Sequence, residues 1–204
     1  MVKIAVLVSG GGTNLQAILD AKAAGSIPHG EISLVLSNRK SAYALERAQV
    51  NHIPSCVLEK DKGMPAESYA ERLLQKLQEY QIEFVVLAGF LTILPYNFIK
   101  AYESRIINVH PSLIPSFCGA GYYGLKVHEA ALAYGVKITG ATVHYVNEVP
   151  DGGKIIAQKA VEILPDDTPQ TLQKRVMVEA EWVLLPQAVE DCCRLILKQG
   201  RNDF

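Results

Sequence analysis

The sequence predicts a single α/β domain with a doubly wound, mostly parallel sheet and an antiparallel hairpin in its C-terminal part. In the first half, apolar runs of strand length alternate with amphipathic stretches, as in parallel strands joined by crossover helices. In the second half, two β-rich runs flank a Pro-Asp-Gly-Gly turn. Because the 204 residues contain no internal repeat, low-complexity segment or linker, we expect one domain over residues 1–204.

The first half is expected to supply the parallel strands and their helices. One helix is predicted to begin near Asn14, a second near Ser41 and a third after Pro65. The third carries apolar side chains at helical spacing, which indicates one buried face. The predicted strands lie near residues 2–8, 32–37, 53–58 and 83–88.

The second half is expected to add the hairpin and a long C-terminal helical region. Residues 138–146 and 154–164 are the two β-rich runs, and they should pair as antiparallel neighbours. Thr168 followed by Pro169 predicts a helix N-terminus. Pro186 should break or kink this helix before it ends at Gly200.

Composition and charge exclude several classes of function. With 20 basic and 21 acidic residues and no basic run, an extended nucleic-acid surface is not expected. The longest apolar stretch, residues 84–94, is about half of what a membrane-spanning helix needs. The N-terminus lacks the features of a signal peptide, and the four cysteines form no disulfide framework or metal-binding spacing. We therefore expect a cytoplasmic protein.

A glycine loop, Ser9–Asn14, follows the first strand and precedes a helix. Backbone N–H groups and the positive end of the helix dipole should face a ligand there, which favours an anion such as a phosphomonoester. The plain alternative is a tight turn. The third glycine of a dinucleotide fingerprint is replaced by Leu15, which disfavours NAD, and no Gly-Lys-Ser/Thr follows for a nucleoside triphosphate.

A second polar group lies where the strand Arg105–His110 is stopped by Pro111. Period-two alternation places Asn108 and His110 on one face of that strand, at the edge of the sheet where ligands bind. Asp151 lies in the hairpin turn, where it could equally be a turn former.

A metal site built from histidines is the alternative use of this region. It would combine His110 with His128 and His144. The spacing of these residues matches no standard metal site, so no metal is expected.

Five blocks of the sequence, taken in order, closely resemble the glycinamide ribonucleotide formyltransferases of purine biosynthesis. The resemblance covers nearly the whole chain and implies a single-domain, Rossmann-like formyltransferase fold. Each block is weak alone, but their order and spacing are specific. The blocks are Val6–Ile18, Val86–Phe90, Ile107–Pro115, Gly140–His144 and Asp151–Gly153.

The resemblance implies transfer of a formyl group from 10-formyltetrahydrofolate to the amine of glycinamide ribonucleotide, without a metal. Attack by the amine creates an oxyanion, which needs donors placed where the charge develops. The resemblance assigns these donors to Asn108 and a protonated His110, and the latter also delivers a proton to the leaving folate nitrogen. Asp151 would favour the imidazolium and help to relay the proton lost by the amine.

The same resemblance implies two sets of binding residues. Gly12, Thr13 and Asn14 would hold the phosphate of glycinamide ribonucleotide, and Glu181 would contact its sugar–glycinamide end. The folate pocket would be formed by Leu91, Thr92, Ile93, Leu94, Asn108, Asn147, Glu148, Val149, Pro150 and Asp151.

Two positions depart from the family pattern. Ala66 and Thr92 stand where relatives carry basic residues that reach toward the glutamate tail of the folate. Other groups, such as Lys60 or Lys62, would have to hold that tail, or it is held less tightly.

Three alternatives use related features. Formyltetrahydrofolate hydrolase has a similar polar triad but carries an additional N-terminal domain, whereas a first strand here begins at residue 2. Methionyl-tRNA formyltransferase adds a basic C-terminal domain. A non-catalytic phosphate-ligand-binding module would use the glycine loop alone. We expect small-molecule partners only, in a monomer or homodimer.

Overall fold

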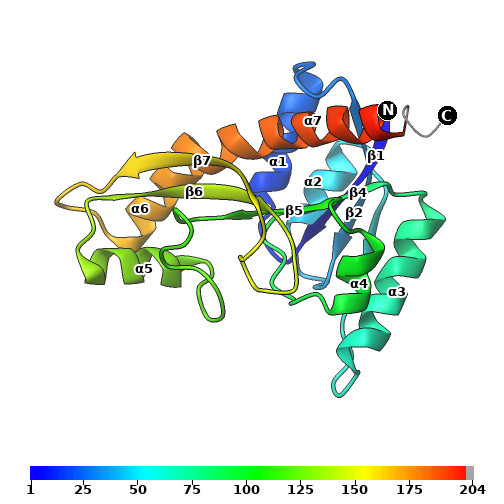
Figure 1. Cartoon of the computed structure of the whole chain (residues 1–204), viewed down its shortest axis with the longest axis horizontal. Coiled ribbons are helices and arrows are strands. Elements are labelled where there is room, and N and C mark those ends of the chain that lie inside the picture. Colours follow the sequence, from blue (N-terminus) through cyan, green and yellow to red (C-terminus); the bar gives the residue numbers. More distant parts are fainter. Residues whose placement is uncertain (201–204) are drawn as a thin grey trace.

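A seven-stranded sheet forms the centre of the molecule (Figure 1). The computed structural model describes residues 1–200, so residues 201–204 of the predicted domain lie outside the described residues. The strands follow the order β3-β2-β1-β4-β5-β6-β7 across the sheet. Their bounds are β1 Val2–Val8, β2 Gly30–Ser37, β3 Ser55–Val57, β4 Phe84–Leu87, β5 Ile106–His110, β6 Ile138–Tyr145 and β7 Ile155–Glu162.

The sheet is parallel from β3 to β5 and antiparallel at β6 and β7. This confirms the predicted mostly parallel α/β fold with an antiparallel hairpin. The strand order reverses between β1 and β4, because the chain first builds outward to β3 and then returns to the other side of β1. A crevice at the carboxyl ends of strands is expected at such a reversal.

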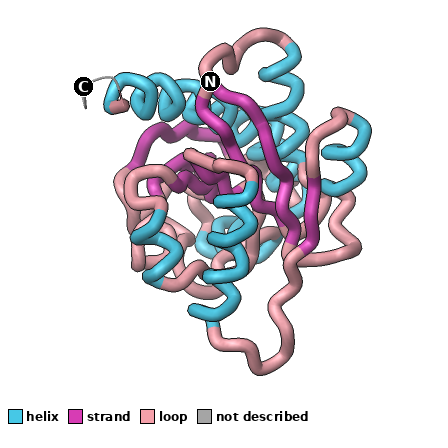
Figure 2. The backbone as a smooth tube through the Cα atoms, turned by 90° about the vertical axis from the view of Figure 1, so that its right-hand side faces the viewer, coloured by secondary structure: helices cyan, strands magenta, loops and turns pink. Residues whose placement is uncertain are grey.

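Helices cover both faces of the sheet, which lies between them in Figure 2. The β1 side chains show why: Ile4 and Val6 pack against α1, α2 and α7, whereas Ala5 and Leu7 pack against α3 and α4. The helices are α1 Thr13–Ala23, α2 Ala44–Val50, α3 Ala66–Glu79, α4 Tyr96–Ala101, α5 Leu125–Tyr134, α6 Pro169–Val176 and α7 Trp182–Gln199.

The C-terminal helical region differs from the prediction. Thr168 caps α6 as expected, since its side chain accepts a hydrogen bond from the Thr171 backbone N–H. However, α7 continues through Pro186, so the predicted break is wrong. The irregular turn comes earlier, as the π-helical segment η1 (Met177–Glu181). The helical region is therefore irregular before Pro186 and not at it. We attribute this to the wide turn of η1, which precedes a proline that cannot donate a backbone hydrogen bond.

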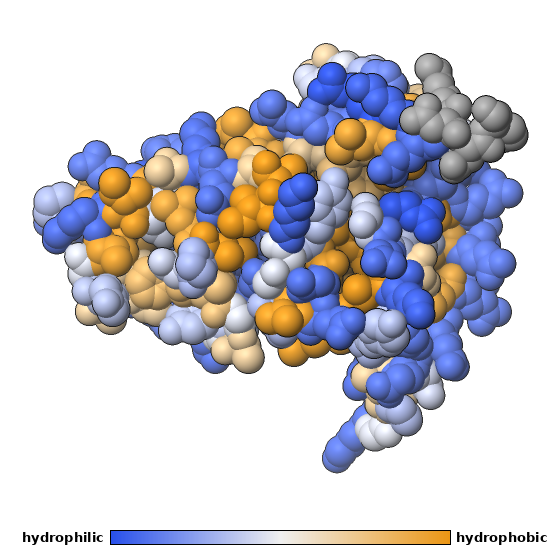
Figure 3. All heavy atoms as spheres, viewed as in Figure 1, coloured by the Kyte–Doolittle hydropathy of each residue, from blue (hydrophilic) through white to orange (hydrophobic). Residues whose placement is uncertain are grey.

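The surface is mixed on the face seen in Figure 3, with apolar side chains scattered among hydrophilic ones. The segment between β3 and α3 projects from the body of the molecule and is largely hydrophilic. Within residues 1–200, no helix combines the length and apolar character needed to cross a bilayer.

Candidate active site

A cleft of about 500 Å³ opens beside the C-terminal ends of β4 and β5. It is lined by Arg39 after β2, Gly89–Ile93 after β4, Asn108–Pro111 at the end of β5, Gly119–Gly124, and Pro150 with Asp151. A smaller cavity of about 120 Å³ lies against it and includes Asn147–Asp151. The two cavities share six lining residues, so they form one continuous space.

Asn108 and His110 both line this space, as strand alternation predicts. The residues between and before them, Val109 and Ile107, belong to the hydrophobic core on the other face of the sheet. The two polar side chains are therefore fixed by a strand whose opposite face is held by packing.

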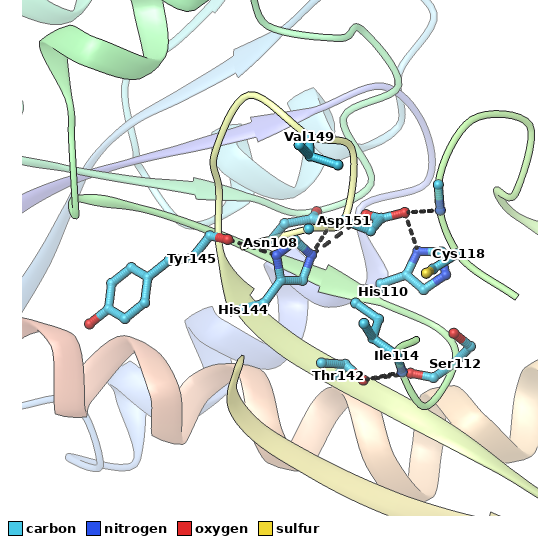
Figure 4. A network of polar contacts seen from close by, with 12 residues as sticks. Asn108, His110, Ser112, Ile114, Cys118, Thr142, His144, Tyr145, Val149 and Asp151 are labelled. Atoms are coloured by element: carbon cyan, nitrogen blue, oxygen red, sulfur yellow. Dashed lines mark hydrogen bonds and ion pairs between the residues drawn. The ribbon is translucent and has the colours of Figure 1, made fainter. Parts of the chain in front are cut away.

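Asp151 reaches the same place from the loop between β6 and β7 (Figure 4). One carboxylate oxygen lies 3.4 Å from Nδ1 of His110 and accepts a 2.9 Å hydrogen bond from the Gly119 backbone N–H. The other accepts a long hydrogen bond of 3.5 Å from the Asn108 amide. Asp151 also has a positive φ of 55°, which is uncommon for a residue other than glycine. The turn therefore holds this carboxylate in place at some cost in backbone strain.

His110 is held between two acceptors. Its Nε2 lies 2.9 Å from the carbonyl oxygen of Phe117, so Nε2 carries a proton and donates it, while Nδ1 faces Asp151. Burial lowers the pKa of His110 below its ordinary value of 6.5, against the opposing effects of the Asp151 carboxylate and the Phe117 carbonyl. Asp151 favours the imidazolium as expected from the sequence, but burial outweighs it.

Asp151 itself stays ionised. Burial alone would raise its pKa, but the hydrogen bond with His144, the charge of His110 and the Gly119 N–H together hold the pKa below its ordinary value of 3.8. A carboxylate therefore faces the imidazole of His110 at neutral pH.

His144, which the sequence suggested only as a possible metal ligand, also belongs to this group. Its Nε2 lies 3.3 Å from the Asn108 amide nitrogen and 3.5 Å from Asp151, while its Nδ1 donates to the Tyr145 carbonyl at 2.8 Å. The signal was the antiparallel register, which pairs Asn108 with His144 across β5 and β6. We call Asn108, His110, His144 and Asp151 the donor cluster.

A network behind the cluster fixes the loop that follows β5 (Figure 4). The Thr142 hydroxyl donates to the Ser112 carbonyl at 2.7 Å and accepts from the Ile114 N–H at 3.1 Å. The Ser112 hydroxyl in turn donates to the Ser116 carbonyl at 2.6 Å. This loop leads to Phe117 and Gly119, which supply the backbone contacts to His110 and Asp151.

His128, the third histidine of the metal alternative, lies on α5 with both ring nitrogens buried and without a hydrogen-bond partner. Burial, aided by the nearby His110, lowers its pKa to about 4, so it is neutral at pH 7. Within residues 1–200, no three His, Cys, Asp or Glu side chains are grouped as metal ligands would be.

Over the part of the chain that the structure describes, the glycine loop uses its backbone carbonyls in hydrogen bonds with the rest of the protein but not its backbone N–H groups. The carbonyl of Gly10 accepts from the Ala44 N–H at 3.1 Å, and that of Gly11 accepts from Nε of Arg47 at 2.8 Å. The carbonyl of Gly12 accepts from the Gln16 N–H at 2.9 Å. Within the described residues, the N–H groups of residues 10–14 have no such partner.

Gly12 is required at its position for two reasons. Its φ is 69°, in the left-handed region, and a Cβ placed there would lie 2.6 Å from the Cβ of Ala44. Helix α2 therefore packs directly against the loop, and only glycine fits between them.

Asn14 and Glu181 contact each other and do not line the cleft. The Asn14 amide donates to the Glu181 carboxyl group at 2.6 Å, and the two residues are 9% and 6% exposed. Burial raises the pKa of Glu181, which the Asn14 hydrogen bond opposes. Thr13 lines a separate groove of about 460 Å³ with Arg47 and Trp182. The structure thus brings these residues beside the glycine loop, with the carboxyl group turned inward.

All ten residues of the predicted folate pocket line the two joined cavities. Leu91 belongs to the larger cavity and Leu94 to the smaller one, whereas Thr92 and Ile93 line both. The segment after β4 and the loop before β7 therefore form opposite walls, as expected from the sequence.

This combination of a doubly wound sheet, a glycine loop and a donor cluster has known relatives. A family model described as formyl transferase matches residues 2–189, and the chain belongs to that family. Within it, a chloroplastic phosphoribosylglycinamide formyltransferase of Arabidopsis thaliana is 41% identical over 197 residues, covering 96% of this chain and 67% of the relative. The resemblance found in the sequence is thereby confirmed.

Two further similarities agree with it. The trifunctional purine biosynthetic protein adenosine-3 of Drosophila pseudoobscura pseudoobscura is 42% identical over 188 residues, which cover 92% of this chain but only 13% of the relative. The crystal structure of glycinamide ribonucleotide transformylase 1 from Symbiobacterium toebii has a TM-score of 0.89 and 38% sequence identity. That similarity covers 95% of this chain and 88% of the other.

Proposed function

We propose that this protein transfers the formyl group of 10-formyltetrahydrofolate to the amine of glycinamide ribonucleotide in de novo purine biosynthesis. The products are formylglycinamide ribonucleotide and tetrahydrofolate. The observation that carries the proposal is the meeting of Asn108, His110 and Asp151 at one end of a cleft whose walls are the predicted folate-binding segments. The formyl transferase relatives support the same chemistry.

In the first step, the amine attacks the formyl carbon and a C–N bond forms. Negative charge develops on the formyl oxygen. The Asn108 amide donates a hydrogen bond to it, and His110 donates another by exchanging its Nε2 contact with the Phe117 carbonyl for the formyl oxygen. Both donors come from one short strand, so the rearrangement is confined to the His110 ring and its contact with Phe117.

In the second step, the bond between the formyl carbon and N10 of the folate breaks. Overall, the amine loses one proton and N10 gains one. His110 delivers the proton to N10, and Asp151 stabilises the imidazolium while helping to relay the proton from the amine. Burial keeps His110 mostly neutral before substrates bind, and the developing oxyanion favours its protonation.

The glycine loop binds the phosphate of the ribonucleotide through the backbone N–H groups of Gly12, Thr13 and Asn14. Glu181, held by Asn14, contacts the sugar–glycinamide end once the substrate is present. Residues 1–204 act as one domain in the cytoplasm, as a monomer or homodimer, with small-molecule substrates as ligands and without a nucleic-acid or membrane partner.

One assay tests this function. Purified protein is incubated with 10-formyltetrahydrofolate, with and without glycinamide ribonucleotide, and release of tetrahydrofolate is followed. We expect release only when the ribonucleotide is present. Release without it would indicate a formyltetrahydrofolate hydrolase, and no release in either case would indicate a non-catalytic module.

A further inference from the structure

Arg39 is the one Lys or Arg side chain among the residues that line the two joined cavities. It follows β2 and faces the larger cavity together with Leu91, Thr92 and Ile93. The remaining lining is apolar, neutral or acidic, apart from His110 and His144 of the donor cluster. A substrate anion in this part of the cleft would therefore meet a single permanent positive charge.

The Arg39 side chain is exposed and has no hydrogen bond or ion pair with any residue that the structure describes. Its backbone, in contrast, is fixed: the Ser37 hydroxyl donates to the Arg39 carbonyl at 2.8 Å and accepts from the Arg39 N–H at 3.0 Å. Arg47 shows the opposite arrangement, because its side chain is committed to Gly11 and Gln16. Arg39 thus offers a guanidinium whose donors are available to a ligand.

The position of Arg39 is tied to the wall of the folate pocket. The amide of its neighbour Asn38 donates to the Thr92 hydroxyl at 2.8 Å, which joins the end of β2 to the segment after β4. Thr92 and Ile93 are among the residues that the two cavities share. Arg39 therefore lines the larger cavity next to a residue that contacts the wall shared by both cavities.

The lysines suggested from the sequence are placed differently. Lys60 and Lys62 are exposed on the projecting segment between β3 and α3, and neither lines the two joined cavities. Of the candidates for an anion contact, Arg39 alone lines the cleft.

We infer that Arg39 binds a carboxylate of the donor's glutamate tail and so selects a glutamylated folate. The inference rests on the proposed function. Two anions enter such a site, a phosphate and a carboxylate, and the glycine loop already provides donors for the phosphate. A guanidinium binds a carboxylate through two parallel hydrogen bonds, which suits the side chain of Arg39.

The test compares two ligands that differ only in the tail: tetrahydrofolate and tetrahydropteroate, which lacks the glutamate. Equilibrium binding of each is measured on the wild-type protein and on Arg39→Ala, Arg39→Lys and Lys62→Ala. Lys62→Ala removes an exposed positive charge away from the cleft and is the matched control. We expect Arg39→Ala to weaken tetrahydrofolate about fivefold, the size of a partly exposed charge pair. Tetrahydropteroate should be unaffected, and Arg39→Lys should recover part of the loss.

Other outcomes would overturn the inference. An equal loss of affinity for both ligands would mean that Arg39 shapes the pocket without contacting the glutamate tail. A loss of glycinamide ribonucleotide binding with an unchanged preference between the folates would assign Arg39 to the phosphate. The binding measurement does not require turnover. If the wild-type protein prefers tetrahydrofolate through Arg39 but does not transfer the formyl group, the proposed function is wrong, whereas the inference about Arg39 still holds.

Discussion

The donor cluster and the glycine loop lie at the same edge of the sheet but present polar groups in different ways. The cluster consists of four side chains carried by β5, β6 and the loop before β7. The loop offers backbone N–H groups, because helix α2 and the first turn of α1 occupy its carbonyls. The rate of formyl transfer should therefore depend on the identity of the side chains in the donor cluster. Phosphate binding should depend on the backbone conformation of the glycine loop.

The largest effect is expected from His110→Ala in the donor cluster. It removes a donor to the oxyanion and the proton carrier together, so kcat should fall by about a thousandfold. The KM for glycinamide ribonucleotide should change less than about threefold, because the glycine loop is intact. Steady-state kinetics with His52→Ala, an exposed histidine, as control would check this; near-normal turnover would contradict the proposed role.

Asp151→Asn should have the next largest effect, with kcat lowered by about a hundredfold. The carboxylate raises the pKa of His110 against burial, so its removal lowers that pKa further. The protonated ring then exists only at lower pH. The pH above which activity falls should therefore be lower in Asp151→Asn than in the wild type. A pH–rate profile and NMR titration of the ring measure this shift. An unchanged or upward shift would show that Asp151 does not act through His110.

Gly12→Ala tests the loop. The new methyl group meets Ala44, and the residue is forced to a positive φ, so α2 and the loop must move apart. We expect the KM for glycinamide ribonucleotide to rise about tenfold or more, with kcat much less affected. The free energy of unfolding should fall by about 1–3 kcal/mol. Gly10→Ala is the matched control, since a Cβ there has no neighbour within 4 Å. Equal effects of the two changes would argue against the backbone account.

Arg47→Ala should have the smallest effect. It frees the carbonyl of Gly11 and removes a contact with Gln16, so the loop loses part of its support. The KM for glycinamide ribonucleotide should rise about three- to fivefold, with kcat unchanged. Arg47→Lys keeps the charge but not the geometry, and full recovery in that variant would show that the charge acts directly on the phosphate.

The sequence was sufficient where a single segment carries the information. Alternation along one strand placed Asn108 and His110 on the same face, and the glycines between a strand and a helix indicated a loop with unpartnered backbone N–H groups. The pairing of Asp151 with His110 followed from the family resemblance and agrees with their 3.4 Å separation. Each of these rests on local pattern or on an ordered set of blocks.

The remaining features depend on contacts between distant segments. His144 joins the cluster through the register of β5 with β6, which no single stretch of sequence specifies. The contact of Asn14 with Glu181 spans 167 positions, and the effect of burial on His110 depends on the whole fold. Pro186 was expected to break or kink a helix because local propensity takes no account of η1, which precedes α7.

The most direct test of the division between the donor cluster and the glycine loop measures the rate of formyl transfer separately from substrate affinity. In one experiment, the single-turnover rate of formyl transfer and the Kd for glycinamide ribonucleotide are measured for the wild type, His110→Ala and Gly12→Ala. We predict that His110→Ala loses the rate and keeps the Kd, while Gly12→Ala loses affinity and, at saturating ribonucleotide, keeps most of the rate. If either variant loses both quantities to a similar extent while remaining folded, the division between donor cluster and glycine loop is wrong.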